Sequence, residues 1–341
     1  MQIKEIAAKL NISPRAIRFY EEKGLIHPAK SAENQYRSFT ENDVWKLQCI
    51  IALREVGMSI EDIRLALIEV DAGNQSELLS LLEIQRSVMF SQWLELKQMV
   101  ETTDQMIAMV KQKQTLPLAD VYTLAEGSKR LRELRKSWHD RWNFDKLAPL
   151  HDERVASGSG ADYRNYDEAL TQTMHWVAPA QGEYGLDIGT GTGNLAGRLL
   201  MRGIRMAAID QSKEMLKHCL RKYPGLETKL GNFLSLPFTD RQFDFIVSSY
   251  AFHHLTDEEK MLALAEMKRV LKPHGRICIT DLMFENEAKR RYPEPAHPAD
   301  ERHYADVSRL IDWFEANGYL ATYKLLDDML CILYAVPIWR Q

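Results

Sequence analysis

The chain has 341 residues, of which 45% are hydrophobic and 27% charged, with a formal net charge of −4. This length is enough for two domains with separate cores, and the interrupted apolar runs are too short to predict a membrane span. Four widely spaced cysteines without a C-x-x-C pair, and an N-terminus without a signal peptide's apolar run, favour a soluble, cytoplasmic protein with reduced thiols and no metal site.

Residues 1–30 predict two short helices. Apolar residues recur at helical spacing between Ile3 and Leu10. Ser13-Pro14 then begins a second helix, because serine is a favoured N-cap and proline is tolerated at the first helical position. Arg15 and Arg18 lie on the polar side of this helix. A reader of the DNA major groove needs arginines at this place, although an ordinary solvated helix would also show them.

A pattern that continues to about residue 70 extends this interpretation. Its segments are Ile3-x-Glu5-Ile6-Ala7, Ser13-x-Arg15-x-Ile17-Arg18-x-Tyr20-Glu21-x-x-Gly24-Leu25-Ile26, Tyr36-Arg37, Asp43-Val44 and Leu53-Arg54-x-x-Gly57-Met58-Ser59-Ile60-x-Asp62-Ile63. Together they closely resemble the MerR family of transcription regulators. The resemblance implies a winged helix-turn-helix whose recognition helix contacts DNA through Arg15, Arg18 and Tyr20, with Ser13 at its start. It also implies phosphate contacts from Tyr36 and Arg37 in the wing.

The predicted wing departs from the family at one position. Gln35 stands where the family usually has glycine before the Tyr-Arg pair, and Asn34 tolerates the positive φ that a tight turn needs. The resemblance implies double-stranded promoter DNA as a partner, bent and untwisted by a dimer that acts indirectly on RNA polymerase. The operator and the sign of regulation are not implied.

Residues 76–113 predict one long helix, because they contain neither glycine nor proline. Apolar side chains recur in alternating steps of three and four, as in a coiled-coil seam. These are Leu78, Leu82, Met89, Trp93, Leu96, Val100, Ile107 and Val110. A helix packed on its own C-terminal domain is the alternative. MerR-like proteins pair such helices antiparallel, so the resemblance implies a homodimer, whose symmetry suits two half-sites on DNA.

The stretch 115–160 is predicted to be a helical linker. Leu116-Pro117-Leu118 ends the long helix. Residues 128–136 form a basic amphipathic pattern, which favours a solvated helix face over a nucleic-acid contact. Residues 156–160 are rich in glycine and serine and precede the next domain.

From residue 184 onward, strands alternate with helices, which favours a doubly wound parallel sheet that binds ligands at the carboxyl ends of its strands. Strands are expected at 184–188, 206–209, 243–249 and 275–281, and another strand ends at 230–233. The first strand ends in the glycine-rich turn Asp187-Ile188-Gly189-Thr190-Gly191-Thr192-Gly193. The second ends in Asp210, which is spaced to reach ribose hydroxyls.

Four motifs carry a second resemblance. They are Asp187–Gly193, Leu236-Pro237-Phe238, Phe252-His253-His254-Leu255 and Arg269-Val270-Leu271-Lys272-Pro273-x-Gly275. They resemble class I S-adenosylmethionine-dependent methyltransferases, most nearly the ubiquinone and menaquinone enzymes. A nicotinamide site on a similar sheet is the alternative, but the usual Gly-x-Gly-x-x-Gly spacing is missing.

This second resemblance implies S-adenosylmethionine as cofactor and assigns residues to it. Asp187 would face the methionine ammonium, while Gly189 and Gly191 would let the backbone approach. Asp210 would bind the ribose. The predicted cofactor set also includes Thr190, Gln211, Asn232, Phe233 and Ser249. Asn232 and Phe233 would hold adenine; many relatives have Asp at the position of Asn232, but an amide oxygen still accepts from the adenine amino group.

Methyl transfer from a sulfonium needs an aligned nucleophile and, where necessary, a base. Tyr250, His253, His254 and Asp281 are the candidates beside the fourth and fifth strands, and the first three form the predicted catalytic set. The His-His pair has an alternative role in shaping the turn after the strand. Nothing resembles the Asn-Pro-Pro-Tyr or Pro-Cys elements of DNA base methyltransferases. The proline-rich stretch 292–298 would cover the substrate mouth or form a plain surface loop.

The predicted domains are a winged helix-turn-helix (1–73), a dimerisation helix (74–114), a helical linker (115–160) and a methyltransferase domain (161–341). The expected fold is therefore multi-domain, α followed by α/β. Three functions remain open: a regulator that senses or methylates a small molecule, a small-molecule methyltransferase whose N-terminal domain provides autoregulation, and a DNA-binding protein with a relic C-terminal domain. An intact glycine turn with Asp210 disfavours the third. The effector or methyl acceptor is not indicated.

Overall fold

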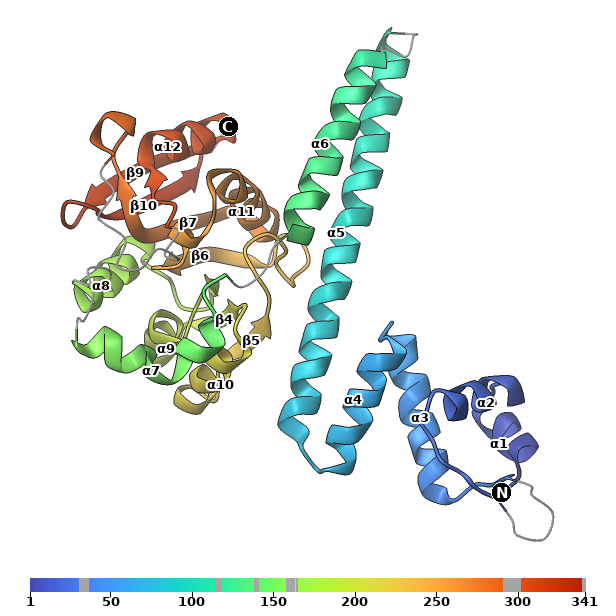
Figure 1. Ribbon diagram of the computed structural model, residues 1–341. Coiled ribbons are helices and arrows are strands. Elements are labelled where there is room, and N and C mark those ends of the chain that lie inside the picture. The colour runs from blue at the N-terminus through green and yellow to red at the C-terminus, as the bar shows by residue number, and fades with distance from the viewer. Residues whose placement is uncertain are drawn as a thin grey trace. The chain divides into compact units, whose positions relative to one another are not determined.

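The structure, a computed structural model, describes residues 1–30, 37–113, 118–137, 141–157, 163, 165–290 and 302–338. The chain divides into two compact units, Met1–Met89 and Phe90–Gln341, and each is described here by itself. The border between them falls inside one helix, α5 (Gln75–Lys113), which is drawn as a single rod in Figure 1.

The N-terminal unit is built from four short helices around one core. They are α1 (Ile3–Leu10), α2 (Pro14–Glu22), α3 (Glu41–Glu55) and α4 (Ile60–Asp71). Strands β1 (Ala29–Lys30) and β2 (Arg37–Ser38) pair antiparallel at the base of the predicted wing. The wing residues 34–36, and thus the predicted phosphate contact Tyr36, lie outside the described residues.

Side-chain caps begin three of these helices, as their sequences predict. The Ser13 hydroxyl accepts from the Ala16 amide at 3.1 Å, and Ser59 caps α4 in the same way. Thr40 and Asp43 form a reciprocal capping box at the start of α3. Ile6, Ile17, Leu47, Ile50 and Ile63 are fully buried among these helices, so one apolar residue or more from each helix forms the core of the unit.

An eight-stranded sheet forms the centre of the C-terminal unit, in the order β5-β4-β3-β6-β7-β10-β9, with β8 paired to β7. Its strands are β3 (Tyr184–Ile188), β4 (Arg205–Asp210), β5 (Glu227–Leu230), β6 (Phe243–Ser249), β7 (Leu271–Phe284), β8 (Ala305–Asp306), β9 (Tyr319–Leu325) and β10 (Leu330–Pro337). Strands β3 to β7 run parallel, whereas β10 is antiparallel to both β7 and β9. The sheet is thus mixed, with a Rossmann-like parallel part.

Helices cover both faces of this sheet. The layers comprise α8 (Tyr166–Val177), α9 (Asn194–Met201), α10 (Lys213–Lys222), α11 (Asp257–Val270) and α12 (Val307–Ala316). Leu186 and Ile188 belong to the core cluster that contains α11 residues, whereas Phe245 and Val247 belong to the cluster that contains α8 and α9 residues. Burial on both faces explains why the strands are continuous apolar runs.

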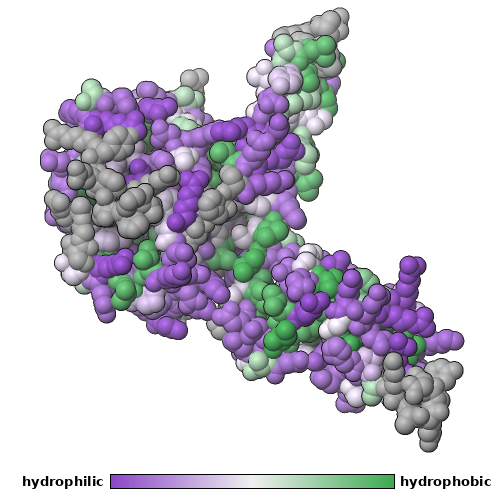
Figure 2. Space-filling view, viewed as in Figure 1, coloured by the Kyte–Doolittle hydropathy of each residue, from purple (hydrophilic) through white to green (hydrophobic). Residues whose placement is uncertain are grey.

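Two further helices precede the sheet in the C-terminal unit. Helix α6 (Leu118–Ser137) returns along α5, as Figure 1 shows, and Lys136 near its end lies 3.7 Å from Glu95 of α5. Helix α7 (Phe144–Ser157) follows. Much of the predicted seam is exposed: Leu96 is 60% and Val100 61% accessible. Figure 2 shows apolar side chains, in green, at the end of the α5–α6 hairpin. Pairing of α5 with a second chain stays a prediction.

The described residues contain no helix long and apolar enough to cross a membrane. Within the same ranges no cluster of His, Cys, Asp and Glu is arranged to hold a metal ion. All four cysteines are free thiols, and three of them are buried in the C-terminal unit. The proline-rich stretch 292–298 and the glycine-serine residues 158–160 fall outside the described part of the chain.

Candidate functional site

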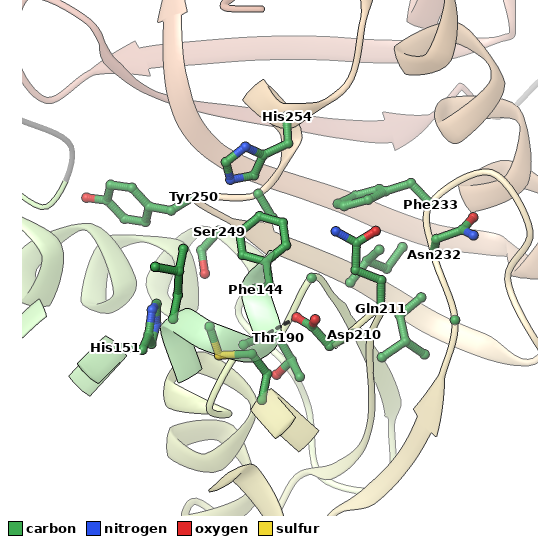
Figure 3. Close-up of a pocket in the computed structure, with 18 of the residues that line it drawn as sticks. Phe144, His151, Thr190, Asp210, Gln211, Asn232, Phe233, Ser249, Tyr250 and His254 are labelled. Atoms are coloured by element: carbon green, nitrogen blue, oxygen red, sulfur yellow. Dashed lines mark hydrogen bonds between the residues drawn. The ribbon is translucent and has the colours of Figure 1, made fainter. Parts of the chain in front are cut away.

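A pocket opens at the carboxyl ends of β3, β4 and β6, where a doubly wound sheet binds ligands (Figure 3). The glycine turn after β3 forms its floor. Gly189, Gly191 and Gly193 all have positive φ, of 71°, 56° and 84°. A Cβ on Gly189 would lie 2.5 Å from the Cβ of Ala251. Only glycine allows this backbone to lie so close to the turn after β6.

Asp210, the last residue of β4, holds the glycine turn in place. Its Oδ2 accepts from the Gly191 amide at 2.8 Å, the dashed line in Figure 3, and its Oδ1 accepts from the Ser212 amide at 2.9 Å. The carboxylate also lines the pocket. The two backbone amides therefore hold the Asp210 carboxylate in a fixed position beside the turn, where a polar ligand group can reach it.

Asp187 lies below the same turn and is fully buried. Its Oδ2 accepts from the Thr190 hydroxyl at 2.7 Å and from the Ala196 amide at 3.2 Å. Its buried Oδ1 has no hydrogen-bond partner among the described residues. Burial, the largest effect, raises the pKa of Asp187 to about 7, and the neighbouring Asp210 adds to the rise.

Two loops form the side of the pocket next to β4 and β5. Gln211 follows Asp210 directly, and Asn232 and Phe233 come from the loop after β5. The Asn232 Oδ1 accepts from the Leu234 amide at 2.9 Å, which fixes the amide group in a local turn. Phe233 is largely buried and packs edge-to-face on Phe252. This side offers an apolar surface beside a fixed amide.

The residues after β6 form the opposite wall. Ser249, Tyr250 and His254 line the pocket, and His253 does not. The His253 ring is buried and its Nδ1 lies 2.6 Å from Asp281 Oδ1. Asp281 Oδ2 in turn accepts from the Phe252 and His253 amides. This pair therefore shapes the turn that presents His254, the structural role left open by the sequence.

The His254 imidazole stacks among aromatic rings. Its centroid lies 4.5 Å from that of Trp142 and 5.0 Å from that of Phe144. Burial, together with the charge of His253, lowers the pKa of His254 well below its ordinary value. The ring is consequently neutral at pH 7, and the same burial makes it a weaker base than an exposed histidine. Burial also raises the pKa of Tyr250, so this phenol keeps its proton.

Helix α7 closes the pocket, although the sequence assigned these residues to a linker. Phe144, Leu147, His151 and Arg154, which recur at helical spacing, line the pocket with Tyr163 and Tyr166. Burial lowers the pKa of His151, so it is a second neutral imidazole. The strand-end motifs of the sequence do not extend to this helix, whose one-sided apolar pattern was the signal for it.

Two carboxylates of α7 hold it over the glycine turn. Asp145 Oδ1 accepts from the Ser212 hydroxyl at 2.6 Å, at the start of α10. One turn before the end of α7, Asp152 accepts from the Thr192 hydroxyl at 2.6 Å and from Lys222 Nζ at 2.9 Å. The helix is thus fastened at both ends to residues that flank the pocket.

The N-terminal unit carries the other predicted site. Arg15 and Arg18 of α2 are exposed, and Tyr20 is half-buried. Ser13 caps the helix, which aims its first turn outward. Arg37 of β2 forms an ion pair with Glu21 of α2 at 2.6 Å. Two arginine side chains on α2 are thus exposed to solvent, and Arg37 is held between α2 and β2.

Known protein families match both the N-terminal and the C-terminal part of the chain. The profile of the MerR HTH family of regulatory proteins matches residues 1–69, and that of a methyltransferase domain matches residues 186–279. An uncharacterised methyltransferase of Oceanobacillus iheyensis is 33% identical over 202 residues, 56% of this chain and 94% of that protein. The chain belongs to the S-adenosylmethionine-dependent methyltransferases. A Geobacillus kaustophilus methyltransferase is 32% identical over 57% of this chain and 94% of its own length, and YrrT of Bacillus subtilis is 31% identical over 57% and 95%.

The pocket of this methyltransferase fits its cofactor, S-adenosylmethionine. Gly189 and Gly191 line the pocket, and Gly191 leaves space in front of His151 that a Cβ would fill. Asp210 presents a carboxylate suited to a ribose, and the buried Oδ1 of Asp187 is an acceptor suited to an ammonium. Of the predicted cofactor residues, Asp187 alone does not line the pocket.

Proposed function

We propose that this protein is a MerR-type transcription regulator whose methyltransferase domain binds S-adenosylmethionine and senses or methylates a small molecule. The observation that carries the proposal is the pair formed by Asp210 and the Gly191 amide, which keeps an intact cofactor turn on a chain with a helix-turn-helix. The proposed DNA contacts are Arg15, Arg18 and Tyr20, helped by Ser13 and by wing residues Tyr36 and Arg37. Binding of promoter DNA would place this function in the cytoplasm.

In this proposal, the residues that line the pocket hold the cofactor by its separate parts. Asp210 and Gln211 bind the ribose, Asn232 and Phe233 hold the adenine, and Asp187 pairs with the methionine ammonium from below. Thr190 and Ser249 complete the polar rim. The bound cofactor supplies an electrophilic methyl group.

The protein's own contribution to transfer would be alignment and proton removal. His254 is the proposed base because its ring lines the pocket and is unprotonated at neutral pH. Its lowered pKa limits it to taking a proton from a group that becomes strongly acidic on methylation. Tyr250 packs 5.0 Å from Tyr166, centroid to centroid, and forms part of an aromatic wall beside His254. His253 acts as a positioning residue through Asp281.

The proposed homodimer rests on helix α5. Its exposed apolar side chains, including Leu96 and Val100, would cost solvation free energy unless a second chain covered them. A twofold dimer would also present two recognition helices to two half-sites. This arrangement would let the protein act indirectly on RNA polymerase at a promoter.

Calorimetric titration of S-adenosylmethionine into the purified protein tests the proposal, followed by DNA-binding measurements with and without the cofactor. We expect saturable binding that is lost in Asp210→Ala, and a DNA affinity that differs between the two states. Binding without any effect on DNA would contradict the regulatory role. No binding at all would contradict the cofactor assignment.

A second function has one observation in its favour. His254 and Tyr250 both line the pocket, so a methyl acceptor bound there would have polar catalytic candidates within reach. This supports a small-molecule methyltransferase whose N-terminal domain provides autoregulation. Transfer of a labelled methyl group to an extract of small molecules tests it. Transfer that is lost in His254→Ala but kept in Arg18→Ala would favour this second function.

A further inference from the structure

The loop between β5 and β6, residues 231–242, touches two different parts of the C-terminal unit. Its beginning belongs to the cofactor pocket, because Asn232 and Phe233 line that pocket. Residues 234–240 lie against the α5–α6 hairpin. Both sets of contacts fall within the same compact unit, Phe90–Gln341.

Polar contacts from both helices reach this loop. The Ser91 hydroxyl of α5 lies 2.9 Å from the hydroxyl of Ser235, and Lys97 of α5 pairs with Asp240. From α6, Arg135 Nε donates to the Leu234 carbonyl at 3.1 Å. Ser235 is only 2% exposed and the Arg135 side chain 6%. The Ser91–Ser235 and Arg135–Leu234 contacts are part-buried, whereas Lys97–Asp240 is exposed. A shift of the loop would change the first two directly.

The loop is short and stiff between its two contact surfaces. Asn232 Oδ1 accepts from the Leu234 amide at 2.9 Å, and the Ser235 amide donates to the Asn232 carbonyl at 3.3 Å. Asn232 and Ser235 also form an isolated antiparallel bridge. A ligand that moves Asn232 therefore moves Ser235, three positions further along, together with it.

A charged network on the other side of the loop involves the same arginine. Glu266 of α11 accepts from the Leu236 amide at 3.2 Å and lies 3.8 Å from Arg135. Glu266 pairs more closely with Arg269, at 2.8 Å. One Nη of Arg135 is buried without a partner among the described residues. The arginine is thus incompletely satisfied here, and a small change in the loop would alter its contacts at modest cost.

The hairpin reaches the pocket by a second route. Trp142, which follows α6 in the chain, packs on His254 with ring centroids 4.5 Å apart. Arg141 lies 3.7 Å from the buried Glu259 at the start of α11. Residues 141 and 142 thus contact α11 and the pocket-lining His254, while Arg135 near the end of α6 contacts Leu234, which follows the pocket-lining Phe233.

We propose that the 231–242 loop is the relay through which the adenine end of the bound cofactor acts on the α5–α6 hairpin. The proposal rests on the proposed function, and it names the element of that site which carries the regulation. Helix α5 begins at Gln75, inside the N-terminal unit, and its Leu78 and Leu81 pack against the core of that unit. A change in the register or stability of α5 would therefore be passed to the core on which the recognition helix α2 packs. Reciprocity requires DNA binding to alter cofactor affinity by the same factor.

Hydrogen exchange of the full-length protein tests the relay, with S-adenosylhomocysteine as the probe because it is not consumed. In the wild type we expect the probe to slow exchange of amides 90–100 and 130–137 by roughly tenfold. In Ser91→Ala/Arg135→Met, this slowing should disappear while the affinity for the probe stays within about threefold, because neither side chain lines the pocket.

Matched controls separate the relay from general damage. Thr103→Ala removes an α5 hydroxyl that bonds only within its own helix, to the Met99 carbonyl. Arg130→Met removes an α6 arginine that pairs with Glu258 of α11 rather than with the loop. Both controls should keep the wild-type slowing. If the double variant does not fold, Ser91→Ala alone, which removes one hydroxyl, gives the decisive comparison.

Two results would overturn the relay. Probe binding to the wild type without slower exchange in α5 and α6 would show that the loop transmits nothing. Full slowing in the double variant would show that transmission follows another route. Failure of the probe to bind is distinguishable from both by calorimetry, and it would overturn the proposed function and the relay with it.

Discussion

Asp187 offers the sharpest test of the cofactor site, because its assignment as partner of the methionine ammonium requires it to be ionised. In the free protein its pKa is raised by burial to about 7, so the carboxyl is largely neutral in mildly acidic solution. Only the ionised form attracts a cation. Affinity for the cofactor should therefore be lost as the pH falls below 7 and should level off above it.

The size of the effect follows from the ionised fraction. With a pKa of about 7, roughly 3% of Asp187 is ionised at pH 5.5 and half at pH 7, so affinity should rise about 15-fold over this interval. Below pH 7, binding should also release close to one proton per ligand. The stability of the free protein has the opposite pH dependence. Asp187 ionises at a lower pH in the unfolded chain than in the folded one, so its contribution to the free energy of unfolding falls as the pH rises from about 4 to 7.

Calorimetric titration of S-adenosylhomocysteine between pH 5.5 and 7, in two buffers of different ionisation enthalpy, measures both affinity and proton release. Asp187→Asn is the matched variant, because an amide oxygen can still accept from Thr190 and from the Ala196 amide. We expect its weaker binding to be independent of pH. A wild-type affinity that is flat across this range, with no proton release, would refute the assignment.

Three further predictions concern other parts of the molecule. Asp210→Ala should weaken S-adenosylmethionine binding by about 1–3 kcal/mol in calorimetry, whereas the exposed Asp312→Ala on α12 should leave the affinity unchanged. Arg18→Ala should weaken binding to promoter DNA. It should also reduce the slope of log affinity against log salt concentration by the amount expected for about one lost phosphate contact, and an unchanged slope would contradict a role of α2 in the interface. Gly189→Ala should lower the thermal midpoint more than Gly182→Ala does. Both glycines have positive φ, but only a Cβ on Gly189 meets another atom within 4 Å, so equal losses would contradict the proposed clash.

The sheet could be predicted where apolar runs are continuous. Residues 184–188 and 243–249 form β3 and β6 with the expected bounds, because strands buried on both faces leave an unambiguous pattern. The strand expected at 275–281 instead runs from Leu271 to Phe284. Of the added residues, Leu271 pairs with Phe243 of β6, Leu282 with Leu330 of β10, and Met283 and Phe284 with Ala305 and Asp306 of β8. These partners are distant in sequence, and no local pattern encodes them.

Some residues of the candidate site could likewise be predicted from the sequence, and others could not. Asp210, Asn232 and Ser249 could be located because each lies at or just after the end of a strand, and parallel strands bring their carboxyl ends to one edge. Helix α7 could not be placed over the pocket, since Asp145 and Asp152 reach Ser212 and Thr192 across long separations in sequence. His253 and His254 are adjacent in sequence, and only the contact with Asp281 decides which of them faces the pocket.

The hydrogen bonds of Asp145 and Asp152 that hold α7 also affect the rate of ligand exchange. If a ligand beneath this helix leaves only after Asp145 and Asp152 release their partners, its exchange would be limited by helix opening rather than by diffusion. Occupancy then follows the average cofactor supply and ignores fluctuations shorter than the opening time. In a regulator, such slow exchange would make the promoter respond to a sustained cofactor concentration and not to brief changes in it.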